Sequence, residues 1–399
     1  MQKKLIALAV TSLASGVVAA QTNVTVYGIA DVGYVYSQGK AGYTPPGGIK
    51  LSGTNKFSGL AGGGVTAGNR LGFKGEEALG NGLKAVFTLE YGLQLDDNSG
   101  VGNIITGGPN ARQQFVGLAS KYGTVALGRQ YAPGFNATAN NDALEATDMG
   151  IQSSLSVYAG NAITPNSPAR YNNSISYTSN NLAGFTASAI YGFGESDIGG
   201  YDNASVYDNS QYGLGLNYAN GPINFDAVWQ SRISVAVPNP VLGGPAKLPG
   251  TSDSINEWYV GGSYDFKVVK AYASYQGLNN NNASGAVSGA YGSDYPIADE
   301  NSIWTVGLTV PVGAAGVVGL SYGRLSTESK NAPDGDSWGA GAMYTYNLSK
   351  RTALYAAYTY FDNDKNSVGV QTQVAAGGLG IGAAGESNYT LGTGIRHSF

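Results

Sequence analysis

Three acidic residues recur at intervals of three in one long polar segment, namely Asp142, Glu145 and Asp148. If this segment forms a short helical turn, the three carboxylates share one side of it and create a local negative field. Acyl-transfer catalysis would instead need a histidine beside a nucleophile and an orienting carboxylate. The single histidine, His397, lies two residues from the end of the chain, and no metal-ligand spacing occurs. These residues therefore indicate electrostatic action, and they argue against an enzyme, a metal site or a cofactor.

Arginines that can oppose these acids lie in segments where apolar and polar residues alternate. Arg70, Arg112 and Arg170 are each out of phase with apolar neighbours, among them Phe115 and Tyr171. Because alternate side chains of a strand point to opposite faces, this phase predicts that all three guanidinium groups point away from the apolar face. Taken alone, the arginines fit ordinary solvated lining equally well.

The elements that must carry these arginines are β-strands. Residues 83–93 place leucines, an alanine, a phenylalanine and a tyrosine on one face, and mostly polar or small residues on the other. Residues 170–177 and 389–399 repeat this period of two. The alternative is a soluble β-sandwich or solenoid, whose apolar faces meet in a shared core. Here the second faces are too small and polar to fill the middle of a large sheet, so we expect water to fill it.

The connections between the strands sort into two lengths. Seven tight turns are predicted near residues 78–82, 120–123, 179–182, 219–222, 265–267, 311–316 and 347–351. Eight long connections are predicted near residues 37–64, 96–108, 132–168, 194–206, 233–253, 278–299, 327–335 and 363–385. Short and long connections alternate strictly, which predicts a transmembrane sixteen-stranded antiparallel up-and-down β-barrel, because such barrels have short turns at one rim and long loops at the other.

Composition and the amino terminus agree with an exported membrane barrel. Only 12% of the residues are charged, whereas soluble domains have about 25%. Residues 1–20 combine two lysines, an apolar core and a small-residue cleavage site, which predicts a signal peptide, with the barrel formed by residues 21–399. Without Lys3 and Lys4 the mature chain has 20 basic and 26 acidic residues, a net charge of −6. With no basic run to neutralise phosphates, nucleic acid is not expected as a partner.

Several short stretches resemble the general porins of beta-proteobacterial outer membranes. They are the sequences NVTVYGIAD from residue 23, NRLGFKGEE from 69, RQQFVGL from 112, GTVALGRQ from 123 and RYNNSISY from 170, together with the terminal Phe399. The resemblance implies a homotrimer in the outer membrane of a Gram-negative bacterium, in contact with its lipid and lipopolysaccharide. It implies that small hydrophilic solutes and ions diffuse passively through each barrel. It also implies that Phe399 is the assembly signal for the outer-membrane insertion machinery.

The resemblance also bears on the pore. Residues 132–135 (APGF) resemble the start of the third loop of this family, which folds into the barrel and narrows it. The resemblance implies that acids of this loop and arginines of the wall face each other across a constriction. The acids are Asp142, Glu145 and Asp148, and the arginines are Arg70, Arg112 and Arg170. Arg129 is in phase with the apolar residues around it, so we place it at a subunit interface or at the root of this loop. Lys74, Lys84 and Glu90 are expected to line the lumen away from the narrowest point.

Two functions of other kinds stay open from the residues alone. The long loops at residues 37–64 and 363–385 suit an adhesion or binding barrel, and a solute-specific channel would have the same fold. The preference between anions and cations is also undecided, because the net charge of −6 favours cations at the mouth and the arginines favour anions at the constriction.

Overall fold

The structure is a computed structural model of the chain. It describes residues 23–40, 53–97, 100–101, 109–194, 210–235, 252–281, 298–329, 333–375 and 381–399. The predicted signal peptide lies outside these residues. Large parts of the predicted loops at residues 194–206, 233–253 and 278–299 do so too, as do residues 41–52 of the first long connection.

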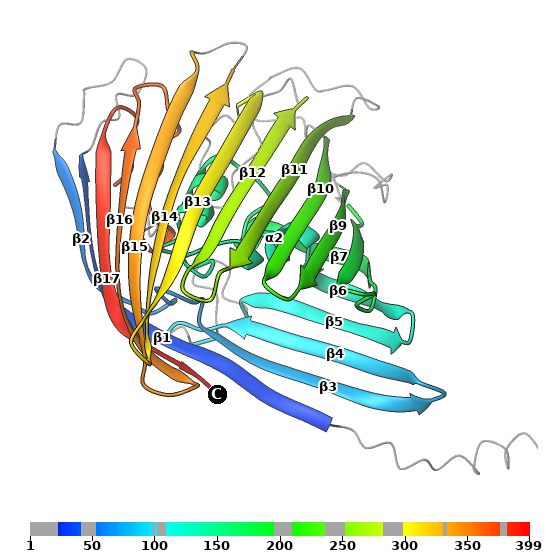
Figure 1. Cartoon of the computed structure of the whole chain (residues 1–399). Helices are drawn as coiled ribbons and strands as arrows, with labels where there is room; N and C mark the ends of the chain where they lie inside the picture. Colours follow the sequence, from blue (N-terminus) through cyan, green and yellow to red (C-terminus); the bar gives the residue numbers. More distant parts are fainter. Residues whose placement is uncertain are drawn as a thin grey trace, which may run out of the picture.

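The described chain is dominated by antiparallel strands that pair with their sequence neighbours (Figure 1). The last strand pairs with the first from Ile29–Ser398 to Gly39–Asn388, and this pairing closes the sheet into a barrel. The strands are β1 (Asn23–Lys40), β2 (Thr54–Ala61), β3 (Arg70–Gly80), β4 (Leu83–Gly92), β5 (Ala111–Ser120), β6 (Gly123–Tyr131), β7 (Arg170–Thr178), β8 (Phe185–Gly192), β9 (Gln211–Asn220), β10 (Ile223–Val235), β11 (Ser252–Asp265), β12 (Lys270–Asn280), β13 (Glu300–Val312), β14 (Gly316–Glu328), β15 (Gly335–Asn347), β16 (Thr352–Asn363) and β17 (Ser387–Ser398).

Two of these seventeen segments share one position in the barrel. On the side of β1 away from β17, β3 pairs with residues 23–29 and β2 pairs with residues 33–40. β2 and β3 are thus two parts of one strand, interrupted by residues 62–69, and the predicted count of sixteen is confirmed. The predicted loop at residues 37–64 is wrong in extent, because β1 continues to Lys40 and β2 lies inside that range.

The tight turns fall where the sequence predicts them. Two-residue turns at residues 81–82, 121–122 and 221–222 join successive strands at one rim, and the long connections lie at the other. The positive φ values of Asn81, 51°, and Gly82, 77°, fit such a hairpin, which needs left-handed backbone at both positions. None of the helices in the described residues is long and apolar enough to cross a membrane.

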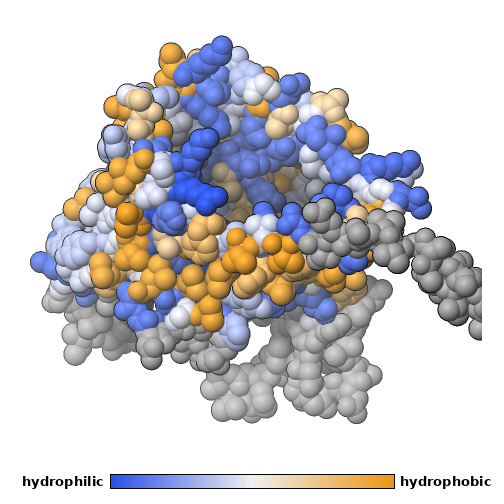
Figure 2. All heavy atoms as spheres, turned by 90° about the horizontal axis from the view of Figure 1, so that it is seen from below, coloured by the Kyte–Doolittle hydropathy of each residue, from blue (hydrophilic) through white to orange (hydrophobic). Residues whose placement is uncertain are grey.

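The two faces of the wall differ as the alternation predicts. Large apolar side chains such as Leu127, Leu214 and Leu391 point outward and are exposed. Outward aromatic rings form a row across neighbouring strands, and the ring centres from Trp304 through Tyr322 to Trp338 are 5.4 and 5.8 Å apart. Such rings suit the boundary between hydrocarbon and water. Figure 2 shows a hollow lined largely by hydrophilic residues, with hydrophobic residues grouped on the outside.

The connection between β6 and β7 folds into the barrel, as predicted. It contains helices α2 (Pro133–Asn140) and α3 (Ile151–Tyr158) and the 3-10 turn η1 (Ser167–Ala169). α2 packs on the inner face of β9–β11, and α3 on that of β13–β15. In an apolar cluster, α3 and residues before it meet Val65 of the 62–69 segment and Val370 of the last loop. A further 3-10 turn, η2 (Gln373–Ala375), lies in this last loop.

Candidate pore site

A cluster of arginines lies on the inner wall where β3 to β7 run side by side. The guanidinium group of Arg112 donates to Glu90 Oε1 at 2.8 Å and to the hydroxyl of Tyr131 at 3.1 Å. The side chains of Arg112 and Glu90 are 12% and 4% exposed. Tyr27 donates to the other oxygen of Glu90 at 3.0 Å. This carboxylate therefore neutralises part of the positive charge and fixes the direction of Arg112.

Arg70 and Arg170 complete the cluster. Arg70 Nε donates to the carbonyl oxygen of Gly68 at 2.9 Å, in the segment that interrupts the second barrel strand. Arg170 lies 5.5 Å from the ring centre of Tyr131 and 5.7 Å from that of Phe135. These two rings are stacked, with centres 3.7 Å apart, so that the first residues of the third loop are attached to the wall beside the arginines.

Phe115 and Tyr171, the apolar neighbours that set the predicted phase of Arg112 and Arg170, do not point outward. Phe115 pairs with Thr88 on the inner face, and Tyr171 is fully buried inside the barrel, where Gln230 donates to its hydroxyl. Arg112 nevertheless points inward because it is the extra residue of a bulge, between the pairs Glu90–Gln113 and Tyr91–Ala111. A second bulge places Asn172 and Asn173 opposite one residue of β6, and Asn173 has a φ of 45°. Each bulge reverses the alternation, which a strict period of two does not anticipate.

The three acids of the third loop do not share one face. The segment from residue 141 to 150 is a series of turns between the two helices, so the predicted helical turn is wrong. Positive φ values at Glu145 and Ala146, 60° and 55°, break the helical path. Glu145 forms an ion pair with Arg396 of β17 at 3.1 Å. Asp142 accepts the backbone N–H of Leu144 at 2.9 Å and is buried.

Asp148 is the acid of this loop that lies within electrostatic range of the arginine cluster. Burial raises the pKa of Asp148 to about 6, while the positive charges of Arg112, Arg170 and Arg70 act to lower that pKa. Asp31 is close enough to oppose the ionisation of Asp148 as well. Burial also raises the pKa of Asp142 to about 6, and there no arginine offsets the effect.

Arg129 lies on the outward phase of β6, opposite Gln114, as predicted. Its Nε donates to the carbonyl oxygen of Ala111 at 3.0 Å, and its Nη1 contacts Asn172 and the backbone of Arg170. Because Arg170 is the first residue after the third loop, Arg129 fastens the root of that loop from outside. Its charge nevertheless lies within electrostatic range of Arg112 and Arg170.

The other charged residues expected in the lumen have defined partners. Lys84 forms an ion pair with Glu76 at 2.9 Å, and Lys74 lies 5.2 Å from the ring centre of Tyr27. Glu90 was expected to line the lumen away from the narrowest point, and its carboxylate pairs with Arg112 within the arginine cluster. The inward phase of Glu90 was readable from the sequence, whereas its pairing with the bulge residue of the neighbouring strand was not.

Buried carboxylates that the sequence analysis missed attach inward-folded segments to the wall. Asp31 Oδ2 accepts the backbone N–H groups of Thr66 and Ala67 at 2.7 and 2.8 Å, and Tyr355 donates to Oδ1 at 2.5 Å. Asp226 accepts amide hydrogens of Asn141 and of its own neighbours on the wall. Nothing in the local pattern separates these acids from ordinary lumen residues.

The carboxyl terminus is part of the closing seam. The backbone N–H and carbonyl groups of Phe399 exchange hydrogen bonds with Gly28 at 3.1 Å. A side chain at position 28 would collide with the ring of Phe399, so that glycine is needed there for the ring to lie against β1. On the other side of β17, Thr352 of β16 contacts His397 Nδ1 at 2.9 Å.

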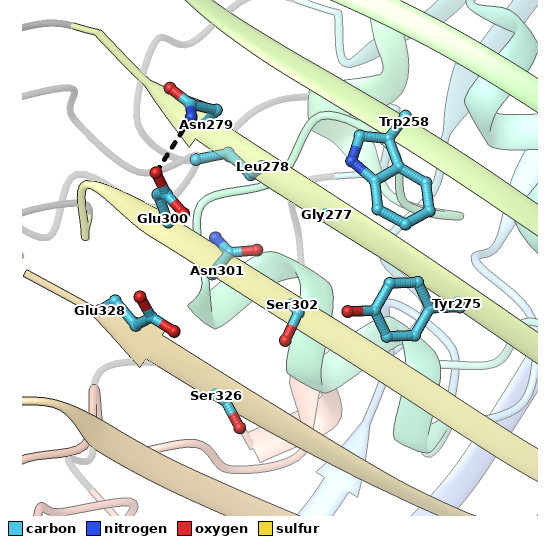
Figure 3. Close-up of a pocket in the computed structure, with 10 residues that line it drawn as sticks. All are labelled: Trp258, Tyr275, Gly277, Leu278, Asn279, Glu300, Asn301, Ser302, Ser326 and Glu328. Carbon is cyan, nitrogen blue, oxygen red and sulfur yellow. Dashed lines mark hydrogen bonds between the residues drawn. The ribbon is translucent and has the colours of Figure 1, made fainter.

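A pocket of about 260 Å³ lies on the outer face of the barrel, not in the lumen (Figure 3). It is bounded by Trp258, Tyr275 and the carboxylates of Glu300 and Glu328. Asn279 donates to Glu300 at 3.2 Å. Within the described part of the chain no group of three or more metal-ligating side chains is present. The pocket therefore contributes nothing to the arginine cluster or to a path through the barrel.

The chain belongs to the Gram-negative porin family, whose model matches residues 7–366. It is 32% identical to outer membrane porin protein 32 of Delftia acidovorans over the whole of both chains. It is 30% identical to an outer membrane porin of Bordetella pertussis, over 91% of this chain and 95% of that one. Among solved structures it resembles the anion-selective porin from Comamonas acidovorans, with 28% identity, a TM-score of 0.69 and coverage of 95% and 100%.

The protein is thus an outer-membrane channel for passive diffusion in a Gram-negative bacterium. Its relatives are channels, not enzymes. The closed barrel and its polar inner face are the physical basis of this activity, because they enclose a wet path across the membrane.

Proposed function

We propose that Arg70, Arg112 and Arg170 form one side of the narrowest part of the channel and that Asp148 forms the other. Glu145 adds negative charge to the loop where it pairs with Arg396 of β17, and Asp142 is buried within the loop. The observation that carries this proposal is the convergence of three arginines from β3, β5 and β7 within electrostatic range of Asp148. An opening narrower than the Debye length, ~8 Å at physiological ionic strength, leaves such a field largely unscreened.

We further propose that the channel prefers small anions. The three arginines of the cluster outnumber Glu90 and Asp148 even when Asp148 is ionised, and the excess of positive charge grows when the pH falls below its pKa of about 6. The solved relative at 28% identity is described as anion-selective, which supports the same sign here. The net charge of −6 of the mature chain is spread over a large surface and acts mainly at the mouths, where salt screens it.

The test is the reversal potential of the channel in a KCl gradient across a planar bilayer. We expect the wild-type potential to have the sign of an anion-selective pore and the double variant Arg112→Gln/Arg170→Gln to shift toward cations. Arg324→Gln is the matched control, because Arg324 lies opposite the outward Trp304 and pairs with Asp336 far from the cluster. An unchanged potential in the double variant would remove these residues from the constriction.

We propose a homotrimer as the assembled state, in contact with lipopolysaccharide, and Phe399 as the residue recognised by the insertion machinery. Closure of the current in three equal steps supports three pores in one assembly. Phe399→Ala should lower the yield of folded protein in the outer membrane without changing the conductance of the molecules that do assemble.

The same recordings separate the rival functions. An adhesion barrel with a filled lumen would conduct no current. A solute-specific channel would show saturable flux, and the preferred solute would block the ion current. An ohmic current without such block supports general diffusion.

A further inference from the structure

We infer that Glu257 and Arg232 are positioning residues that clamp the returning arm of the third loop and thereby hold the channel open. Glu257 Oε2 accepts the backbone N–H groups of Ala162 and Ile163 at 2.8 and 2.9 Å. Arg232 donates to Glu257 Oε1 at 2.6 Å and to the carbonyl oxygen of Gly160 at 2.9 Å. Two side chains on the neighbouring strands β10 and β11 therefore grip three residues of one turn.

The clamp is built for holding and not for passing ions. The side chain of Glu257 is 1% exposed and that of Arg232 is 16% exposed. A carboxylate this deeply buried must have its charge compensated and its oxygens hydrogen-bonded, because removing it from water is costly. Here the compensation comes from one arginine and two loop amides, so the carboxylate and the loop depend on each other.

The gripped turn lies in the returning arm of the loop. It follows α3 and leads through η1 to Arg170, the arginine that lies over Tyr131 and Phe135. Ile163 also packs in a buried cluster with Ala137 of α2 and with Val228 and Tyr259 of the wall. A displacement of the turn therefore disturbs α2, which packs against Ile163. It also displaces Arg170, because the chain continues from the turn through η1 to this residue.

This inference rests on the proposed constriction, since it treats the third loop as the element that narrows the pore. Without the clamp, the returning arm keeps weaker attachments, such as the bond from Asn301 to the carbonyl oxygen of Ala159 at 3.2 Å. The returning arm can then detach from the wall, and the space into which it can move is the lumen. We therefore expect transient partial closures, with little change in the selectivity of the open state.

The test compares Glu257→Gln and Arg232→Met with Glu76→Gln in single-channel recordings of the full trimer. Glu76 pairs with Lys84 on the lumen wall and holds no loop, so its variant controls for the loss of an ion pair. We expect the fraction of time in partially closed states to rise about tenfold or more in both clamp variants, because each lost hydrogen bond to a charged group shifts an equilibrium by at least that factor. The control should behave as wild type.

A second measurement follows the loop directly. The chain contains no cysteine, so Ala162→Cys supplies a single label site in the gripped turn. Ala162 is 1% exposed, and a water-soluble maleimide should react slowly with the cysteine when the clamp is intact. We expect the reaction to be about tenfold faster when Glu257→Gln is added, in line with the shifted equilibrium.

Unchanged closures and unchanged labelling in the clamp variants would overturn the inference, even if the melting temperature fell, because that combination means a purely structural ion pair. Failure of the proposed constriction has another signature. In that case Arg112→Gln/Arg170→Gln leaves the reversal potential unchanged, while the labelling of Ala162→Cys still responds to Glu257→Gln.

Discussion

The barrel wall contains two buried arginine–glutamate pairs that are alike in chemistry and differ in surroundings. Arg112–Glu90 spans 2.8 Å on β5 and β4, and Arg232–Glu257 spans 2.6 Å on β10 and β11. The first pair is surrounded by tyrosine hydroxyls and further arginines, and the second by backbone amides of the third loop. The neighbours of an ion pair thus decide whether its charge acts on passing ions or is consumed in holding the chain.

The largest expected difference between the two pairs comes from removing their arginines. Arg112→Met should shift the reversal potential in a KCl gradient strongly toward cations, because it removes one positive charge and leaves Glu90 uncompensated. Arg232→Met should leave the potential of the open state unchanged, because its charge is enclosed between wall and loop. Equal shifts in both variants would show that the two pairs do not differ in the proposed way.

A smaller change of opposite sign is expected at Glu90. Glu90→Gln keeps a carbonyl acceptor for Arg112 and Tyr131 but removes the negative charge from the cluster. The reversal potential should move toward the anion limit, whereas Glu257→Gln should not move it. A cation-ward shift in Glu90→Gln would mean that the lost carboxylate had been holding the arginines in the channel.

A pH titration sharpens the role of Asp148. Its pKa of about 6 means that the carboxyl is mostly neutral below that pH and charged above it. Anion preference should therefore decline as the pH rises from about 5 to about 7, since an ionised carboxylate offsets one arginine. Asp148→Asn should keep the high anion preference at both pH values. If the variant titrates as the wild type does, another group is responsible.

The smallest expected effect concerns stability. The pKa of Asp142 is about 6 in the folded protein against an ordinary value of 3.8, so folding favours its protonated form. The ionised carboxylate of Asp142 does not lower the stability below pH 3.8. Its destabilising effect grows as the pH rises and is complete above about pH 6. Asp142→Asn should therefore raise the melting temperature at neutral pH. The gain in the free energy of unfolding should be at most about 3 kcal/mol. The gain should vanish in acid; a gain independent of pH would contradict the assignment.

The architecture follows from features that repeat along the chain, and for that reason it was predictable. The alternation of apolar and polar residues, as in 83–93 or 389–399, indicates a strand with one lipid-facing and one water-facing side wherever it occurs. Tight turns are marked by residues that accept left-handed backbone, such as Asn81 and Gly82. The inward position of Arg112 was predicted on a false premise, because one extra residue at a bulge reverses the phase and leaves no local mark.

The candidate site was only partly predictable for a related reason. The three arginines belong to strands and follow the barrel, but Asp142, Glu145 and Asp148 lie in turns whose directions depend on tertiary packing. Glu145 pairs with Arg396, which lies more than two hundred residues further along the chain. Glu257 of β11 accepts backbone amides of the third loop. Such partners are set by the closed barrel, and the local pattern around either residue contains no trace of them.

The interruption of the second barrel strand has a consequence for assembly. Asp31 accepts hydrogen bonds both from residues 66 and 67 and from Tyr355 on β16, and Val65 lies against Gly392 of β17. The amino-terminal segment therefore acquires its full set of partners only after the carboxyl-terminal strands have met β1. Closure of the barrel and ordering of residues 62–69 in its interior are therefore completed together. A barrel in which β17 has not fully paired with β1 would also lack part of its channel lining.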